Sequence, residues 1–158
     1  MQRQVCRRLT RAFSSAVSRA SLPGTFTLQT RVQDTDLQGH INNVKYYEYM
    51  DTAICTWSAM HGDSLEDNWR FIAETGLTYR RPAVWPDSVE VRFGTKHVGN
   101  SSVEYKVGMF NTDGQLLADG KFVHVYVSKD GRPHRIPDVS RKLLDSLAIA
   151  SHPADEES

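Results

Sequence analysis

The chain has few of the features that would place a protein in a special class. Its uninterrupted apolar runs are only a few residues long, whereas a membrane-spanning helix needs about 20 apolar residues in succession. Two cysteines, Cys6 and Cys55, are too few for a disulfide framework or for a cysteine-based zinc site. The composition, 39% hydrophobic and 24% charged, is that of ordinary globular proteins, and 158 residues correspond to one domain. We therefore expect a single globular domain without a membrane span.

Acidic residues and lysine are absent from residues 1–33, which contain six arginines. The whole chain has nineteen basic and nineteen acidic residues, so residues 34–158 carry thirteen basic and nineteen acidic groups. The body of the protein is therefore acidic. An acidic body argues against non-specific binding of nucleic acid, which needs a basic face. We expect no nucleic-acid partner.

Residues 1–23 are rich in arginine, serine and alanine. On a helix drawn at about 100° per residue, Val5, Leu9, Phe13 and Val17 lie on one side and the arginines on the other. An acid-free amphipathic start of this kind is typical of an organellar transit peptide. We predict a mitochondrial (matrix) transit peptide at residues 1–23, a domain at residues 24–150 and a polar tail at residues 151–158. The alternatives are a plastid transit peptide or a basic N-terminal extension of a cytosolic protein.

The periodicity of apolar residues predicts a strand, a long helix and then a run of strands. Alternation indicates strands at residues 26–33, 71–79, 89–93, 103–109 and 116–127. Between the first two, apolar residues recur every three or four positions, which indicates a helix packed on one face. Its expected face is Val44, Tyr47, Met50, Asp51, Ile54 and Trp57. Pro137 opens a short helix whose expected buried residues are Val139, Leu143, Leu144 and Leu147.

This order of elements predicts an α+β fold, with the long helix after the first of about five antiparallel strands. The segment between that strand and the helix, D-T-D-L-Q-G-H-I-N-N at residues 34–43, is unusually rich in polar groups. A helix N-terminus presents unpaired N–H groups and a partial positive charge, which can stabilise an oxyanion. A carboxylate beside it can activate water or attack a carbonyl. The residues alone therefore indicate a candidate acyl-transfer site.

The same segment, followed by Tyr46 and Tyr47, resembles the signature of hotdog-fold acyl-CoA thioesterases of the 4-hydroxybenzoyl-CoA thioesterase type. Residues 79–87, Y-R-R-P-A-V-W-P-D, are similar to the family's strand, Pro-Ala and acidic turn. The resemblance covers roughly residues 25–148. It implies a curled antiparallel sheet wrapped around the helix, homodimers that often pair into homotetramers, and an active site at the dimer interface.

The resemblance also implies roles for individual residues. Asp36 would be the catalytic carboxylate, as general base or as nucleophile, and the backbone N–H of Asn43 would polarise the thioester carbonyl. Gly39 would allow a tight turn and close approach of the substrate. His40 would orient Asp36 or contact the thioester, with a loop-stabilising role as the alternative. No metal or cofactor is implied, because coenzyme A enters as part of the substrate.

Other side chains have structural as well as functional interpretations. Tyr46 and Tyr47 are expected to pack on the helix face, with one of them lining the acyl pocket, for which Leu77 is a further candidate. Asp34 is expected to be a structural hydrogen-bonding group. Asn42 or Asn43 is a natural N-cap of the helix.

Three basic residues, Arg80, Arg81 and Lys96, are candidates for contacts with the phosphates of coenzyme A, or they are simply solvated. His124 lies in a predicted strand and is expected to be a satisfied core or interface residue. Cys55, in the middle of the helix, lacks the electropositive surroundings that activate a thiol.

The preferred function is hydrolysis of an acyl-CoA thioester inside an organelle. One alternative keeps the fold but acts as a hydratase or dehydratase on enoyl or hydroxyacyl thioesters. Those enzymes typically have Asn-Pro before their histidine, and this chain shows no such run. A non-catalytic acyl-CoA-binding module and a hydrolase of carrier-protein thioesters are further alternatives.

Overall fold

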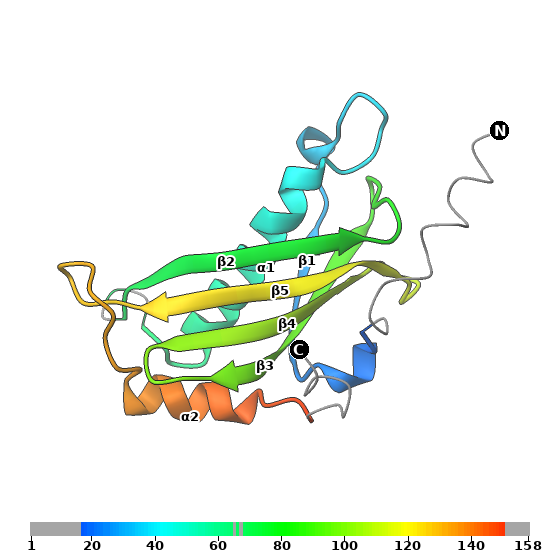
Figure 1. Ribbon diagram of the computed structural model, residues 1–158. Coiled ribbons are helices and arrows are strands. Elements are labelled where there is room, and N and C mark those ends of the chain that lie inside the picture. Colours follow the sequence, from blue (N-terminus) through cyan, green and yellow to red (C-terminus); the bar gives the residue numbers. More distant parts are fainter. Residues whose placement is uncertain (1–16, 65, 67, 151–158) are drawn as a thin grey trace.

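The computed structural model describes residues 17–64, 66 and 68–150 (Figure 1). Five strands form one antiparallel sheet in the order β1-β3-β4-β5-β2, so β1 and β2 are its edges. One face of the sheet is covered by the long helix α1, and α2 lies beside β3 (Figure 1). The bounds are β1 Gly24–Gln29, α1 Asn43–Met60, β2 Arg70–Tyr79, β3 Ser88–Val98, β4 Ser102–Phe110, β5 Leu116–Tyr126 and α2 Asp138–Ser146. This arrangement confirms the predicted α+β hotdog fold.

The core lies between α1 and the sheet, and the predicted face of α1 is confirmed only in part: Met50 and Ile54 are completely buried, as predicted. Tyr46 and Tyr49 are buried, whereas Val44 is 63% exposed. The buried face of α1 is rotated relative to the predicted one, because both phenols are buried with hydrogen-bond partners. Tyr46 Oη accepts from the Ala83 N–H, and Tyr49 Oη donates to Asp34. Burial of a tyrosine is favourable when its hydroxyl is paired in this way.

The first strand is shorter than the predicted residues 26–33. Beyond Gln29, the backbone N–H and the hydroxyl of Thr30 both bond to the Asp87 carbonyl oxygen, at 3.0 and 2.6 Å. A 3₁₀ turn, η2 (Val32–Asp34), follows, and it leaves Val32 64% exposed. The alternation of apolar residues therefore extends past the point where the chain leaves the sheet.

The terminal helix and β3 also differ in detail from the predictions. β3 runs well beyond the predicted residues 89–93, to Val98. Leu144 of α2 and Leu147, the residue that follows the helix, are buried. Val139, in the first turn of α2, is 65% exposed. Among the described helices, none is both long and apolar enough to cross a membrane.

Part of the predicted transit peptide packs against the sheet. Residues 1–16 lie outside the described part of the chain, but Val17 and Leu22 are buried. Arg19, in the 3₁₀ turn η1 (Arg19–Ser21), forms an ion pair with Glu90 of β3 at 2.5 Å. The import signal at residues 1–23 stays a prediction, and the tail at residues 151–158 also lies outside the described residues.

Candidate active site

The loop before α1 folds back on itself around a glycine. The Asp36 N–H donates to the His40 carbonyl oxygen at 2.7 Å, and the Gly39 N–H donates to the Asp36 carbonyl oxygen at 3.1 Å. Gly39 has a φ of 77°, a left-handed conformation in which a side chain would be strained. The tight turn predicted at Gly39 is therefore confirmed.

The carboxylate of Asp36 is oriented by this loop. Its Oδ1 accepts hydrogen bonds from the backbone N–H groups of Gln38, at 2.8 Å, and His40, at 3.2 Å. In the described part of the chain, no protein group bonds to Oδ2, and the residue is exposed. One carboxylate oxygen thus fixes the side chain, while the other is available for chemistry.

The N-terminus of α1 begins directly after this loop. Asn42 is its N-cap, because Asn42 Oδ1 accepts from the Val44 N–H at 3.0 Å. Within the described hydrogen bonds, none uses the backbone N–H of Asn43, the first residue of the helix. An unpaired N–H at the positive end of a helix of 18 residues is suited to binding a developing negative charge.

Asp36 and Asn43 line the same open pocket, which has a volume of about 310 Å³. Tyr46 and Tyr79 form one wall, with their rings edge to face and 5.1 Å between centroids. Burial is the main cause that raises the pKa of both phenols, so they stay protonated. The full lining is Asp36, Gln38, His40, Ile41, Asn43, Tyr46, Tyr79, Arg80, Arg81 and Pro82.

The other carboxylate of the segment, Asp34, has a structural role, as predicted. It is completely buried, and it accepts hydrogen bonds from Arg31 at 2.8 Å and from the Tyr49 hydroxyl at 2.8 Å. The hydrogen bond from the Arg31 guanidinium holds the pKa of Asp34 below its usual value. Asp34 therefore anchors the loop to α1 and does not face the pocket.

The structure brings together four of the seven predicted site residues: Asp36, His40, Asn43 and Tyr46. Tyr47 and Leu77 are partly buried and pack against the core, and neither lines this pocket.

The end of β2 and the segment after it supply residues that the analysis of single positions missed. Tyr79 donates from its hydroxyl to the Asn43 carbonyl oxygen at 3.0 Å, and Pro82 lines the pocket. The only sequence signal for them was the family-like motif at residues 79–87, because nothing in the spacing links Tyr79 to a helix that begins 36 residues earlier.

The three candidate phosphate-binding cations differ in their surroundings. Arg80 is held by Asp119 of β5, with Nε and Oδ1 2.6 Å apart. Arg81 is exposed at the rim of the pocket, and no ion pair reaches it from the described residues. Lys96 does not line this pocket. Arg81 is therefore the cation best placed to meet an anionic group of a ligand.

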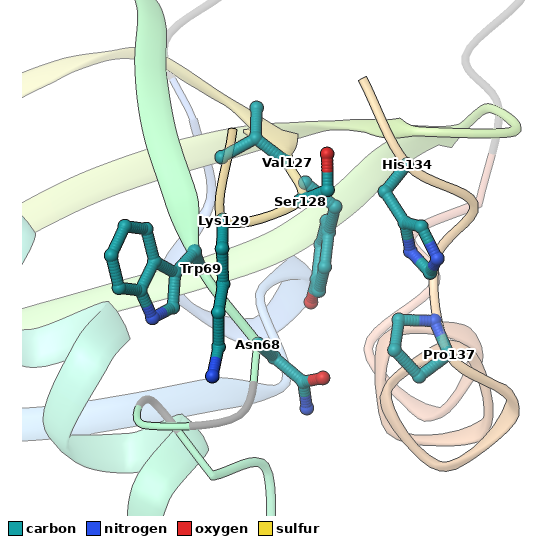
Figure 2. Close-up of a pocket in the computed structure, with 8 residues that line it drawn as sticks. Asn68, Trp69, Val127, Ser128, Lys129, His134 and Pro137 are labelled. Carbon is teal, nitrogen blue, oxygen red and sulfur yellow. The ribbon is translucent and has the colours of Figure 1, made fainter. Parts of the chain in front are cut away.

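A second hollow of about 160 Å³ lies where β5 ends and the loop to α2 begins. Figure 2 shows the side chains of Trp69, Lys129 and His134 around it. Its lining is Asn68, Trp69, Tyr126, Val127, Ser128, Lys129, His134 and Pro137, without an aspartate or glutamate. It therefore lacks the carboxylate that a water-activating site of the predicted kind needs.

A third cavity, of about 400 Å³, lies between α1 and the first residues of β2. Asp51 and Cys55 of α1 and His124 of β5 are among its lining residues. Burial lowers the pKa of His124 to about 3, so its ring is neutral. Burial also raises the pKa of the Cys55 thiol to about 11, which agrees with the prediction that Cys55 is not activated.

The first pocket combines an oriented carboxylate with a helix N-terminus whose leading N–H is unpaired. This combination suits attack of water on a thioester, because the carbonyl is electrophilic and thiolate is a good leaving group. On a hotdog fold, these features define the class as a thioester hydrolase.

Sequence comparison confirms this class. Residues 30–147 match the thioesterase-like superfamily, and the chain belongs to that family. Among the curated protein sequences, none matches the chain at a significant level.

Solved structures of three bacterial proteins are similar to this chain. A Pseudomonas aeruginosa protein is 31% identical with a TM-score of 0.79, over 85% of this chain and 97% of that one. A Thermus thermophilus thioesterase crystallised with coenzyme A and zinc is 28% identical with a TM-score of 0.71, over 80% and 95%. A 1,4-dihydroxy-2-naphthoyl-CoA thioesterase from Synechocystis, 18% identical with a TM-score of 0.72 over 78% and 96%, shares the fold.

Proposed function

We propose that this protein hydrolyses acyl-CoA thioesters to a free acid and coenzyme A, with Asp36 as the catalytic carboxylate. The observation that carries the proposal is the shared pocket of Asp36 and Asn43. Membership of the thioesterase-like superfamily and the coenzyme A complex of the Thermus relative support the substrate class.

In the proposed reaction, the thioester carbonyl oxygen accepts a hydrogen bond from the backbone N–H of Asn43. The partial positive charge of the helix N-terminus stabilises the oxyanion that forms. Asp36 either takes a proton from the attacking water or attacks the carbonyl itself to give an anhydride that water then cleaves. Both routes release the same acid and thiol. The backbone N–H of His40 positions Asp36 through its hydrogen bond to Asp36 Oδ1.

The remaining parts of the substrate would contact residues around the rim and the core. Arg81 would meet a phosphate of coenzyme A, because its guanidinium is exposed beside the reacting groups. Tyr46 lines the pocket and would contact the start of the acyl group. Tyr47 and Leu77 are proposed to line the deeper acyl path.

The assembly proposed from the family resemblance is a homodimer or homotetramer. Its support here is β2, an edge strand on which Phe71 is 53% exposed and Ile72 51% exposed. Exposed apolar residues on an unpaired edge favour pairing with another chain. The exposed Asp36 would then be enclosed by the second subunit.

A mitochondrial location is proposed for the same protein. The arginines and the amphipathic pattern of the N-terminal residues support it. The burial of Val17 and Leu22 favours an import signal that ends before Val17, because cleavage after residue 22 would remove two buried side chains.

The test is release of free thiol from a panel of aliphatic and aromatic acyl-CoA substrates, followed with a colorimetric thiol reagent. Asp36→Asn is the informative variant, because the amide oxygen can still accept the two loop hydrogen bonds. We expect its kcat to fall about 10²- to 10⁴-fold, the usual contribution of a general base. Asp113→Asn, in the exposed turn after β4, is the matched control and should keep the parent rate.

The same assay separates the alternatives. A hydratase or dehydratase would change enoyl absorbance without releasing thiol. A binding module would bind acyl-CoA with no difference in thiol release between the parent and Asp36→Asn. Either result would overturn the proposed function.

A further inference from the structure

We propose that Asp51, Cys55 and His124 form a binding site for one divalent transition-metal ion of the zinc type. One ligand atom from each of the three residues lies within 4.8 Å of the other two. The thiol Sγ of Cys55 and Oδ1 of Asp51 are already 3.6 Å apart. Zinc bonds of about 2.0–2.3 Å to oxygen, nitrogen and sulfur place neighbouring ligands roughly 3.3–3.8 Å apart. Rotation of the side chains that moves the ligand atoms by about 1 Å would complete this geometry.

The fold brings these residues together from distant parts of the chain. Asp51 and Cys55 are four residues apart on α1, so they project from successive turns of the same helix face. His124 is on β5, where it is paired with Ile72 of β2 and Val103 of β4. The helix and the sheet therefore supply ligands from opposite walls of the cavity between them.

His124 provides independent support. His124 is 2% exposed. Its Nδ1 is one of three buried side-chain nitrogen or oxygen atoms without a hydrogen-bond partner in the described part of the protein. The ring is fixed edge to face against Phe122, with centroids 4.6 Å apart, and against Tyr105, with centroids 6.0 Å apart. A buried imidazole nitrogen without a partner is costly unless something binds near it.

The charge balance of the cavity allows a cation. Arg70, which also lines it, forms an ion pair with the buried carboxylate of Asp63, with Nη1 and Oδ2 2.7 Å apart. The Arg70 guanidinium carbon also lies 5.4 Å from the Tyr126 ring centroid. A carboxylate and a thiolate would carry two negative charges, which match the two positive charges of the metal ion.

The donor set indicates which metal the site would take. One oxygen, one sulfur and one imidazole nitrogen are ligands of zinc, whereas Mg²⁺ and Ca²⁺ prefer oxygen alone. On binding, the Cys55 thiol loses its proton to solvent and the sulfur coordinates as thiolate. Three protein ligands leave the fourth position of a tetrahedral ion open toward the cavity of about 400 Å³.

The site is distinct from the thioesterase pocket, because none of its three residues lines that pocket. It joins the middle of α1 to β5, so an ion there would tie the helix to the sheet. We expect saturating zinc to raise the Tm of the protein, since a ligand that binds only the folded state stabilises it.

The test is a titration of the full-length, chelator-treated protein with Co²⁺, which absorbs through a sulfur-to-cobalt charge-transfer band when a thiolate binds it. We expect one Co²⁺ per chain with this band, and displacement of the band by Zn²⁺. Cys55→Ser should abolish the band. His124→Gln and Asp51→Ala should each weaken Co²⁺ binding at least 10-fold. Cys6→Ser, which alters the other cysteine of the chain, is the matched control and should keep the band.

Circular dichroism of each variant shows whether it is folded. Asp51→Ala changes a half-buried residue, so it reports on the site even if His124→Gln does not fold. Absence of the band in the parent protein would overturn the proposal. Persistence of the band in Cys55→Ser, or its loss in Cys6→Ser alone, would place the metal elsewhere and would overturn it equally.

Discussion

The phenol of Tyr79, the last residue of β2, donates a hydrogen bond of 3.0 Å to the backbone carbonyl of Asn43, the first residue of α1. Figure 1 shows the start of α1 near this end of β2. The bond ties the residue whose N–H would polarise the substrate to the edge of the sheet. It therefore sets where the helix N-terminus lies relative to the segment that carries Arg81.

Tyr79→Phe should weaken catalysis by misplacing that helix start. Loss of one neutral hydrogen bond costs about 0.5–1.5 kcal/mol, so we expect kcat to fall about 2- to 13-fold with a small loss of stability. Thiol release measures kcat, and urea unfolding measures stability. Thr75→Val, which removes a β2 hydroxyl bonded to the Lys121 carbonyl away from the pocket, is the control. Equal kcat values for the two variants would contradict this role of Tyr79.

Gly120→Ala should destabilise the pairing of β5 with β2. A Cβ at Gly120 would fall on the backbone carbonyl of Gly76 in β2, whereas a Cβ at Gly76 meets nothing within 4 Å. We expect Gly120→Ala to lower the free energy of unfolding by about 1–3 kcal/mol, the cost of overpacking. Gly76→Ala should change it by less than about 0.5 kcal/mol. Urea unfolding of both variants tests the comparison, and equal effects would contradict it.

Leu22 should be needed for stability even though it precedes the first strand. Its side chain is completely buried, so Leu22→Ala should cost about 2–5 kcal/mol of unfolding free energy. Leu37→Ala, in the exposed loop, should cost less than about 0.5 kcal/mol. Removal of residues 1–16 should preserve the Tm, whereas removal of residues 1–22 should lower it. An unchanged Tm after the longer deletion would show that this segment does not stabilise the domain.

Asp34 should make stability depend on pH in the acidic range. Because the pKa of Asp34 is lower in the folded protein than the value of 3.8 expected for the free side chain, the unfolded chain binds more protons between those two pKa values. Its contribution is therefore present above about pH 4 and is lost as the pH falls through the folded pKa.

The measurement is the unfolding free energy of the parent and of Asp34→Asn from pH 7 down to pH 3. At pH 7 the variant should be less stable by about 1–3 kcal/mol, the cost of a weakened bond to a charged group. The difference should shrink below about pH 4. A difference that does not change with pH would mean that the carboxylate charge of Asp34 contributes nothing.

The sequence predicted most of the fold because its strands and helix have clear periodicity. It failed where polar groups are buried with distant partners. The face of α1 was predicted only in part, because Tyr46 and Tyr49 are buried through bonds to Ala83 and Asp34, which spacing cannot reveal. The end of β1 was misplaced because Thr30 leaves the ladder to bond with Asp87, although the alternation continues.

The candidate site was predictable to a similar extent. Asp36, His40 and Asn43 were found because they lie in one continuous motif beside a helix start. Tyr79 could be placed at the site only after the fold was known. In the cluster of Asp51, Cys55 and His124, the histidine follows Cys55 by 69 residues, so only the fold brings it to the two helix residues.

The central claim is that Asp36 performs chemistry and does not merely bind or shape the loop. A single-turnover experiment tests it most directly, with enzyme in excess over an acyl-CoA that the parent hydrolyses, and with acyl-CoA affinity measured in parallel. We predict that Asp36→Asn keeps the parent's Kd within about threefold while its single-turnover rate falls at least about 100-fold. A single-turnover rate equal to that of the parent, at equal affinity, would contradict the account.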